Sequence, residues 1–422
     1  MFLKLMDETL WTLLFLPLFL LCALVIFPQL PQLLKPLGRR GERQEEREGS
    51  LRPFQAAGTV LAATVGTGNI VGTAQAIAMG GPGAVFWMWI AAILGCAVKA
   101  GEIACGHRFG GAMQYIRALL GRIPAACYAA LALLSTLLVG NMAQVNASVL
   151  ALDGLRIFPP GWGRVFLCVV LGALAALCLC GGVRAVGRIC AVFVPFMTLI
   201  YVLGALLFLN ERHREILPAL RSIVRGAFGA PAALGAASGL SMKQALLWGL
   251  RRGAFSNEAG LGSAANIHGC AGGSDPAKNA LWGVFEVLVD TILLCTLSAL
   301  VILCSGLEVP RGVLPGPELT KAAFAQAWGD RGASLFVGLV LAFFGFSTVL
   351  GCYVTGQRCA SWLGLEEKKF RLLYLFCCFM GGIVPLELIW NTADAANVWM
   401  ATPNLLALIL VFWGGLSGKR EA

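Results

Sequence analysis

Long runs of apolar residues, separated by short polar or charged stretches, occupy most of the 422-residue chain. A helix needs about 20 apolar residues to cross the hydrocarbon core of a bilayer, so the pattern predicts about 11 membrane-spanning helices. These segments lie at 8–27, 54–79, 83–106, 124–150, 163–181, 187–209, 243–271, 280–305, 333–360, 369–389 and 395–415. The runs are continuous and do not alternate with polar residues, which indicates an all-α integral membrane protein rather than a membrane barrel.

The composition supports this class. Hydrophobic residues make up 58% of the chain and charged residues 13%, whereas soluble domains usually carry about 25% charged residues. A soluble enzyme, a disordered chain and a nucleic-acid-binding module are therefore excluded. The net charge of +10 is explained by Lys and Arg in cytoplasmic loops. We expect the lipid bilayer as a partner, no nucleic acid, and no implied oligomer.

Charges in the loops predict the orientation of the chain. If the charged loop at 31–53 is cytoplasmic, the other basic loops also lie inside, in agreement with the positive-inside rule. The loop at 211–242 is the exception, because it would be external and yet carries several arginines. Its Ala-, Gly- and Leu-rich second half is a candidate surface helix.

The spans divide into one extra helix and two sets of five. The expected units are an N-terminal helix at 1–30, a cytoplasmic loop at 31–53, five helices at 54–210, an external loop at 211–242, five helices at 243–416 and a cytoplasmic tail at 417–422. An odd number of spans in each half inverts the second half relative to the first, as in many secondary transporters.

Two segments carry glycines and small polar residues in the middle of the membrane, at 62–72 and at 255–263. Each glycine weakens a helix by about 1 kcal/mol relative to alanine. An unwound turn frees carbonyls for a cation and amides for a carboxylate, and it is tolerated at this depth only where it lines a cavity. We therefore expect a broken helix in each half. The alternative is close helix packing through Gly68 and Gly72, which have the required spacing.

The cysteines and histidines show no metal site. The chain has 15 Cys without a CxxC pair, and three His, at 107, 213 and 268. Most of the cysteines lie inside apolar runs, where they behave as small buried hydrophobes. We therefore expect neither zinc nor haem, and no organic cofactor.

Several motifs resemble those of the alanine or glycine:cation symporter family. They include Ala-Ala-Thr-Val-Gly-Thr-Gly-Asn-Ile at 62–70 and Arg-Gly-Ala-Phe-Ser-Asn-Glu-Ala-Gly-Leu-Gly-Ser-Ala at 252–264, with further matches at 80–84, 86–89, 140–146, 290–296, 346–351 and 403–405. The resemblance extends from about residue 54 to the C-terminus. It implies a LeuT-type five-plus-five inverted repeat with broken core helices 1 and 6. It also implies sodium-coupled import of a small neutral amino acid by alternating access across a prokaryotic cell membrane.

The resemblance also implies where the coupling ion binds. In this fold the main sodium site joins carbonyls of the first break to hydroxyls of core helix 8, here Ala62, Val65, Ser347 and Thr348. Carbonyl and hydroxyl oxygens are the hard ligands that such a cation prefers. The alternative is that both hydroxyls bond to their own helix. A second sodium site near Thr64, Asn69 and Ser256 is left open.

A zwitterionic substrate needs partners at both ends. Its carboxylate should meet the amides of the first break, where helix-end dipoles favour an anion, and its ammonium should meet carbonyls of the second break. A polar side chain in mid-membrane usually faces the interior, although it can also join packed helices. Predicted substrate-binding residues are Gly66, Thr67, Gly68, Gln144, Phe255, Ser256, Asn257, Thr348 and Cys352.

Ionisable residues inside the membrane are costly and usually face inward. Glu258 lies at the second break, where we expect it to cap broken backbone amides. Glu286 and Asp290 lie four residues apart on one helix face, which favours a gating or packing role. Lys99 and Glu102, near a cytoplasmic helix end, are expected to snorkel or to pair.

Cys352 departs from the family pattern, in which this position commonly carries tryptophan. If the position lines the pocket, a thiol in place of an indole enlarges it. Alanine or glycine then becomes a less certain substrate, and a larger polar amino acid such as serine or glutamine becomes a candidate.

Two other functions remain as alternatives. The first is proton coupling, with Glu258 or Asp290 as the carrier. The second is a polytopic membrane enzyme, which would need a serine–histidine or paired-aspartate arrangement on facing helices. His268 follows Ser263 on the same segment, and Asp290 has no convincing intramembrane partner. We therefore expect a transporter and no catalytic residues.

Overall fold

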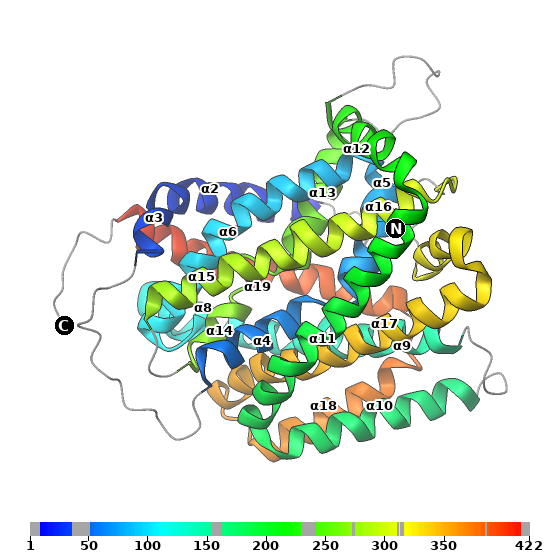
Figure 1. Ribbon diagram of the computed structural model, residues 1–422. Coiled ribbons are helices and arrows are strands. Elements are labelled where there is room, and N and C mark those ends of the chain that lie inside the picture. The colour runs from blue at the N-terminus through cyan, green and yellow to red at the C-terminus, as the bar shows by residue number, and fades with distance from the viewer. Residues whose placement is uncertain are drawn as a thin grey trace.

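The computed structural model describes residues 9–35, 51–153, 162–228, 242–271, 275–309, 312, 316–384 and 386–414. Within this part of the chain every regular element is a helix, and one isolated bridge joins Leu51 to Ala271. The long helices lie side by side as a bundle (Figure 1). The tail at 417–422 and most of the cytoplasmic loop at 31–53 lie outside the described residues.

The N-terminal segment and the first set of five spans form a continuous series of helices. The N-terminal helix consists of η1 (Trp11–Phe15), α2 (Leu16–Ile26), η2 (Phe27–Gln29) and α3 (Leu30–Leu33). The next elements are α4 (Pro53–Thr64), η3 (Gly68–Gly72), α5 (Thr73–Gly80), α6 (Gly83–Phe109), α7 (Ala112–Leu120), α8 (Arg122–Leu137), η4 (Leu138–Ala143), α9 (Gln144–Asp153), α10 (Trp162–Cys180) and α11 (Gly182–Glu211).

The second set follows the surface helix α12 (His213–Phe228). Its elements are α13 (Met242–Asn257), α14 (Ser263–His268), α15 (Pro276–Val287), η5 (Leu288–Cys295), α16 (Thr296–Cys304), α17 (Glu318–Trp362), α18 (Glu367–Gly381) and α19 (Leu386–Trp413). Helix α17 is interrupted at Gly329, whose φ of 70° and ψ of 167° are not helical. A short helix therefore precedes the long span.

Eight described helices are long and apolar enough to cross a membrane, and nine if the bent pair α4 and α5 counts as one span. Two of the 11 expected segments do not meet this criterion. Segment 243–271 is divided between α13 and α14, and its first half contains Lys243, Arg251 and Arg252. Segment 369–389 corresponds mainly to the 15-residue helix α18. The break divides the first segment, and the second helix is too short, so neither provides one long apolar helix. Both segments are nevertheless largely helical, as predicted.

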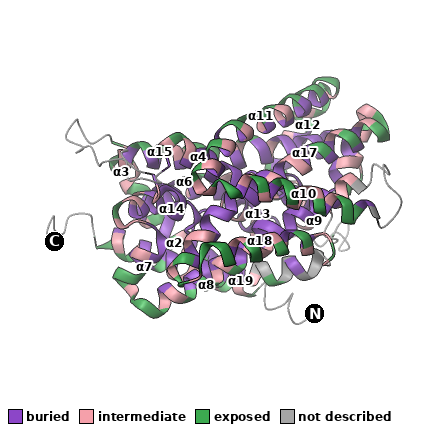
Figure 2. Cartoon of the chain, turned by 90° about the horizontal axis from the view of Figure 1, so that it is seen from below, coloured by how far each residue is buried: buried purple, intermediate pink, exposed green. Residues whose placement is uncertain are grey.

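The outer faces of the bundle are apolar. Large side chains such as Leu177 and Val192 are exposed by 73% and 74%, respectively. Figure 2 shows buried residues in the inner helices and many exposed residues on the outward faces of the outer ones. A lipid-facing surface explains this distribution, because soluble monomers rarely expose large contiguous apolar patches.

Both predicted helix breaks are present. Helix α4 ends at Thr64, Val65 is extended (φ −75°, ψ 91°), and the chain resumes in the π-helical turn η3 with a bend of 49° between the two halves. The second break runs from Glu258 to Gly262, where Glu258, Gly260 and Gly262 have φ values of 54°, 93° and 75°. Left-handed backbone suits glycine but is strained for Glu258.

Close glycine packing does not explain the first break. A Cβ on Gly68 would meet no atom within 4 Å, and one on Gly72 would lie 3.9 Å from its nearest neighbour, the Arg252 side chain. Neither glycine is therefore needed for a tight helix contact. Both glycines belong to the π-helical turn η3, which follows the extended residue Val65.

The segment at 211–242, which we expected to be an external loop, is partly helical. Its first half forms α12, whose Ala227 carbonyl accepts a hydrogen bond from the Trp87 indole at 3.4 Å. This contact places α12 beside the N-terminal end of α6. The candidate surface helix in the second half, from 229 to 241, lies outside the described residues.

Candidate functional site

The backbone amides freed by the first break are held by side-chain oxygens. The Gly66 amide donates to Asn69 Oδ1 at 2.9 Å. The Thr67 amide and hydroxyl both donate to Gln144 Oε1, at 3.1 and 2.9 Å. Gln144 begins α9 directly after the π-helical turn η4, and its amide nitrogen donates to the Val139 carbonyl at 3.1 Å. One carboxamide therefore satisfies two donors of the fully buried Thr67.

The carbonyl side of the first break faces α17. Thr348 Oγ1 lies 3.4 Å from the Val65 carbonyl oxygen, and a Cβ on Gly66 would come within 2.5 Å of the same hydroxyl. A Cβ on Gly351 would come within 2.9 Å of the Ala62 carbonyl carbon. The predicted sodium residues of the two helices are therefore brought together, because small residues allow the backbones to approach closely.

The hydroxyls on α17 also bond within their own helix. Ser347 and Thr348 both donate to the Phe344 carbonyl, at 2.8 and 3.0 Å. A donated hydroxyl keeps its oxygen lone pairs as acceptors. The helix bonding anticipated as the alternative is therefore present, and it is compatible with cation binding at the same oxygens.

A polar cluster joins the two breaks to η5. The Asp290 carboxylate accepts hydrogen bonds from Asn69 Nδ2 at 2.7 Å, from Ser256 Oγ at 2.7 Å and from Thr291 Oγ1 at 2.8 Å. Asn69, Asp290 and Thr291 are fully buried, and Ser256 is 5% exposed. Thr64 does not take part, since its hydroxyl donates to the Val60 carbonyl at 3.1 Å. Asp290 thus lies at the centre of contacts between both broken helices.

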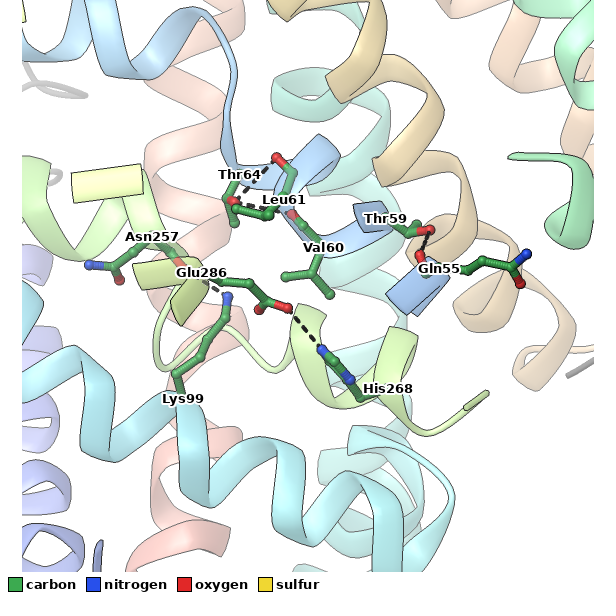
Figure 3. A network of polar contacts seen from close by, with 9 residues as sticks. All are labelled: Gln55, Thr59, Val60, Leu61, Thr64, Lys99, Asn257, His268 and Glu286. Carbon is green, nitrogen blue, oxygen red and sulfur yellow. Dashed lines mark hydrogen bonds and ion pairs between the residues drawn. The ribbon is translucent and has the colours of Figure 1, made fainter. Parts of the chain in front are cut away.

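Lys99 holds the end of α13 at the second break. Its side chain is fully buried, and its amine donates to the Asn257 carbonyl at 2.8 Å (Figure 3). The last carbonyls of a helix have no partner within the helix and carry partial negative charge. Of the two expectations for Lys99, snorkelling is therefore wrong and internal pairing is correct.

Glu102 stabilises the far side of the second break. One of its oxygens accepts from the Gly262 amide at 2.8 Å and from Asn404 Nδ2 at 2.6 Å. Asn404 also donates to the Gly260 carbonyl at 2.9 Å. Glu258, which we expected to cap this backbone, instead accepts from the Ser263 hydroxyl at 2.5 Å. The carboxylate that accepts the Gly262 amide therefore belongs to α6 and not to the break itself.

The structure also shows a buried pair that the sequence did not reveal. His268 Nε2 lies 3.0 Å from Glu286 Oε1, and both side chains are fully buried between α14 and α15 (Figure 3). These residues are separated by 18 positions. The pair forms because α14 and α15 both pack against α4 and α6, and this arrangement is not visible in the sequence.

A small cavity of about 30 Å³ lies beside the breaks. Phe255 and Cys352, both predicted to bind substrate, line it together with Gly140. Asn257, by contrast, uses its side chain within the break, donating to Thr291 at 3.2 Å and accepting from the Ala259 amide at 3.0 Å. The predicted site residues thus divide into a central group at the breaks, a group lining this cavity, and Asn257 as part of the framework.

Comparison with known sequences identifies the family of this chain. Residues 2–414 match the sodium:alanine symporter family. The chain is 36% identical to the sodium/alanine symporter AgcS of Methanococcus maripaludis, over 90% of this chain and 86% of the relative. It is 35% identical to a Bacillus subtilis protein named "Probable sodium/glutamine symporter GlnT", over 86% of this chain and 77% of the relative.

Solved structures show the same fold at low sequence identity. The structure of MhsT in complex with L-phenylalanine matches with a TM-score of 0.60 and 14% identity, over 88% of this chain and 90% of that one. A manganese transporter mutant of Eremococcus coleocola matches with a TM-score of 0.57 and 14% identity, over 89% and 80%. The predicted LeuT-type fold is confirmed. This chain belongs to the sodium:alanine symporter family, and it is a multi-pass membrane transporter rather than an enzyme.

Proposed function

We propose that the protein imports a small neutral amino acid together with sodium, by alternating access across a prokaryotic inner membrane. The observation that carries the proposal is the meeting of two helix breaks whose backbone groups are held by exchangeable side-chain oxygens. The Thr67 amide and hydroxyl, for example, share one oxygen of Gln144. Such a site offers amides to a carboxylate and carbonyls to cations.

The substrate carboxylate is assigned to the amides of Gly66, Thr67 and Gly68. In the absence of substrate, Gln144 Oε1 satisfies Thr67 at 3.1 and 2.9 Å. A carboxylate oxygen accepts the same bonds and carries the negative charge that a helix N-terminus favours. The substrate ammonium is assigned to the carbonyl end of α13, ahead of the Asn257 carbonyl that Lys99 binds.

Sodium is assigned to the carbonyls of Ala62 and Val65 and the hydroxyls of Ser347 and Thr348. The 3.4 Å approach of Thr348 Oγ1 to the Val65 carbonyl supports this site. A second sodium is assigned to the Ser256 hydroxyl and the Asp290 carboxylate, whose oxygens lie 2.7 Å apart. Asn69 supports this site by donating from Nδ2 to the same carboxylate at 2.7 Å, while its Oδ1 accepts from the Gly66 amide. Thr64 contributes no ligand to this second proposal, because its hydroxyl turns back to its own helix.

The driving force is sufficient for accumulation. At about 100 mV, each positive charge that enters with the substrate contributes about 2.3 kcal/mol. Since about 1.4 kcal/mol corresponds to a factor of ten, one sodium alone supports more than tenfold accumulation.

The direct test is uptake of radiolabelled alanine into proteoliposomes. We expect accumulation with an inward sodium gradient and none with a proton gradient alone. The Ser347→Ala/Thr348→Ala double variant should raise the sodium concentration for half-maximal uptake at least tenfold, because two oxygen ligands are lost. Accumulation driven by protons alone would instead support the alternative of proton coupling through Glu258 or Asp290.

Gln144→Leu provides a separate test of the carboxylate site. The change preserves approximate volume but leaves the Thr67 amide and hydroxyl without their 3.1 and 2.9 Å partner. An unsatisfied buried donor costs about 1–3 kcal/mol. The substrate carboxylate should relieve that cost, so we expect tighter amino-acid binding and a slower release step. Measured Kd and uptake rate should therefore both fall; an unchanged Kd would argue against substrate contact with Thr67.

A further inference from the structure

The cavity next to the breaks extends one helical turn beyond the predicted substrate residues. It begins at Gly140, Phe255 and Cys352, and it continues between α8, α17 and α19. Ser135, Thr355 and Asn397 line this extension. If the breaks hold the carboxylate and ammonium of an amino acid, its side chain would extend into this chamber.

The packing of Cys352 explains why the chamber is open. A Cβ on Gly140 would lie 2.6 Å from Cys352 Sγ, so this thiol fits directly against the glycine of η4. A larger side chain at position 352 could not occupy the same place and would have to project toward the cavity. The small residues at both positions therefore leave space beyond the breaks.

The lining of this extension includes polar side chains among apolar ones, although the region is buried. The Ser135 hydroxyl donates to Asn397 Oδ1 at 2.6 Å. Thr355 is 4% exposed, and its hydroxyl has no hydrogen-bond partner in the part of the chain that the structure describes. A buried polar group without a partner costs about 1–3 kcal/mol, so a ligand that supplies the partner is favoured.

The size of the cavity restricts what can fill it. About 30 Å³ is available, whereas one water needs about 10–15 Å³ on the same measure. The space therefore fits roughly two water-sized groups, such as the end of a carboxamide or a hydroxymethyl group.

We propose that this cavity is a side-chain subsite for a hydroxyl or carboxamide, so that the transporter prefers polar neutral amino acids over apolar ones of equal size. The subsite rests on the proposed function, since the breaks must hold the backbone of an amino acid. A site built to hydrogen-bond a substrate group discriminates strongly against analogues that lack it, because its own polar atoms are then left unpaired. Thr355 is the specificity-determining residue in this arrangement.

The test uses nearly isosteric pairs of amino acids as competitors. Sodium-driven uptake of radiolabelled alanine is measured in proteoliposomes with unlabelled threonine against valine, and asparagine against leucine. We expect the polar member of each pair to inhibit at a concentration at least tenfold lower. Equal inhibition within both pairs, with alanine uptake intact, would overturn the subsite and leave the proposed function standing. Absence of uptake or inhibition by any amino acid would instead reject the proposed function.

Two matched variants locate the effect. Thr355→Val removes the hydroxyl at nearly constant volume and should bring the threonine-to-valine ratio close to one without abolishing alanine uptake. Thr320→Val is the control, because Thr320 lies in the short helix that precedes the interruption of α17 at Gly329, away from the cavity lining. Its hydroxyl is also fully buried and also has no partner among the described residues. It should keep the wild-type ratio. A wild-type ratio in Thr355→Val would refute the assignment.

Discussion

Replacing Lys99 with methionine is expected to abolish sodium-driven uptake and to destabilise the protein by about 3 kcal/mol or more, the usual cost of removing one partner of a buried charged contact. Lys99 is fully buried and donates to the Asn257 carbonyl at 2.8 Å. Its positive charge also attracts Glu102, Glu258 and Asp290, which are all buried nearby. Methionine retains similar volume, so the effect reports the lost amine rather than a cavity.

The measurement combines uptake with thermal unfolding of the purified protein in detergent. Lys278→Met is the matched control, because Lys278 is exposed at the start of α15 and should tolerate the change. Lys99→Arg keeps the charge and should restore part of the stability, but the larger guanidinium should not restore full uptake. Normal uptake by Lys99→Met would show that the second break holds its shape without a cation.

Asp290→Ala is expected to eliminate transport, and Asp290→Asn to raise the sodium concentration for half-maximal uptake more than tenfold. The carboxylate accepts from Asn69 at 2.7 Å, from Ser256 at 2.7 Å and from Thr291 at 2.8 Å. Alanine leaves these buried donors unpaired, whereas asparagine keeps one acceptor oxygen and loses the charge that a cation requires. The two variants therefore separate structural support from ion binding.

Sodium titrations of uptake at several pH values distinguish the two coupling ions. If Asp290 binds sodium, Asp290→Asn shifts the sodium curve and leaves the pH dependence unchanged. If Asp290 carries a proton, the same variant removes the pH dependence and leaves the sodium curve in place. Asp330→Asn serves as the control, since Asp330 is exposed near the start of the long span in α17 and should change neither curve.

The helix breaks were predictable because they depend on local chemistry. Glycines at Gly66, Gly68, Gly260 and Gly262 weaken a helix wherever the chain places them, and the observed backbone departs from helix within these two motifs. The π-helical turns η4 and η5 were not predictable in this way. A π turn arises from one additional residue in the hydrogen-bond ladder, which leaves no distinct pattern in composition or hydropathy.

The contacts at the breaks depended on packing across the chain. Lys99 meets Asn257 across 158 positions, and Asn69 meets Asp290 across 221. Hydropathy placed Lys99 near a helix end and could not tell an amine that reaches lipid headgroups from one that reaches a helix terminus. It also could not show that Glu102, rather than Glu258, accepts the Gly262 amide.

The sequence by itself determined the membrane-embedded helical class, the positions of both breaks and, through its motifs, the family. These properties follow from burial of apolar segments, from local backbone preferences and from residue patterns that act over a few positions. Only the tertiary structure decided that Asp290 joins the breaks, that Lys99 binds the end of α13 and that a polar cavity opens beside Cys352. Each of these depends on which faces of distant helices meet, and that is set by the packing of the whole bundle.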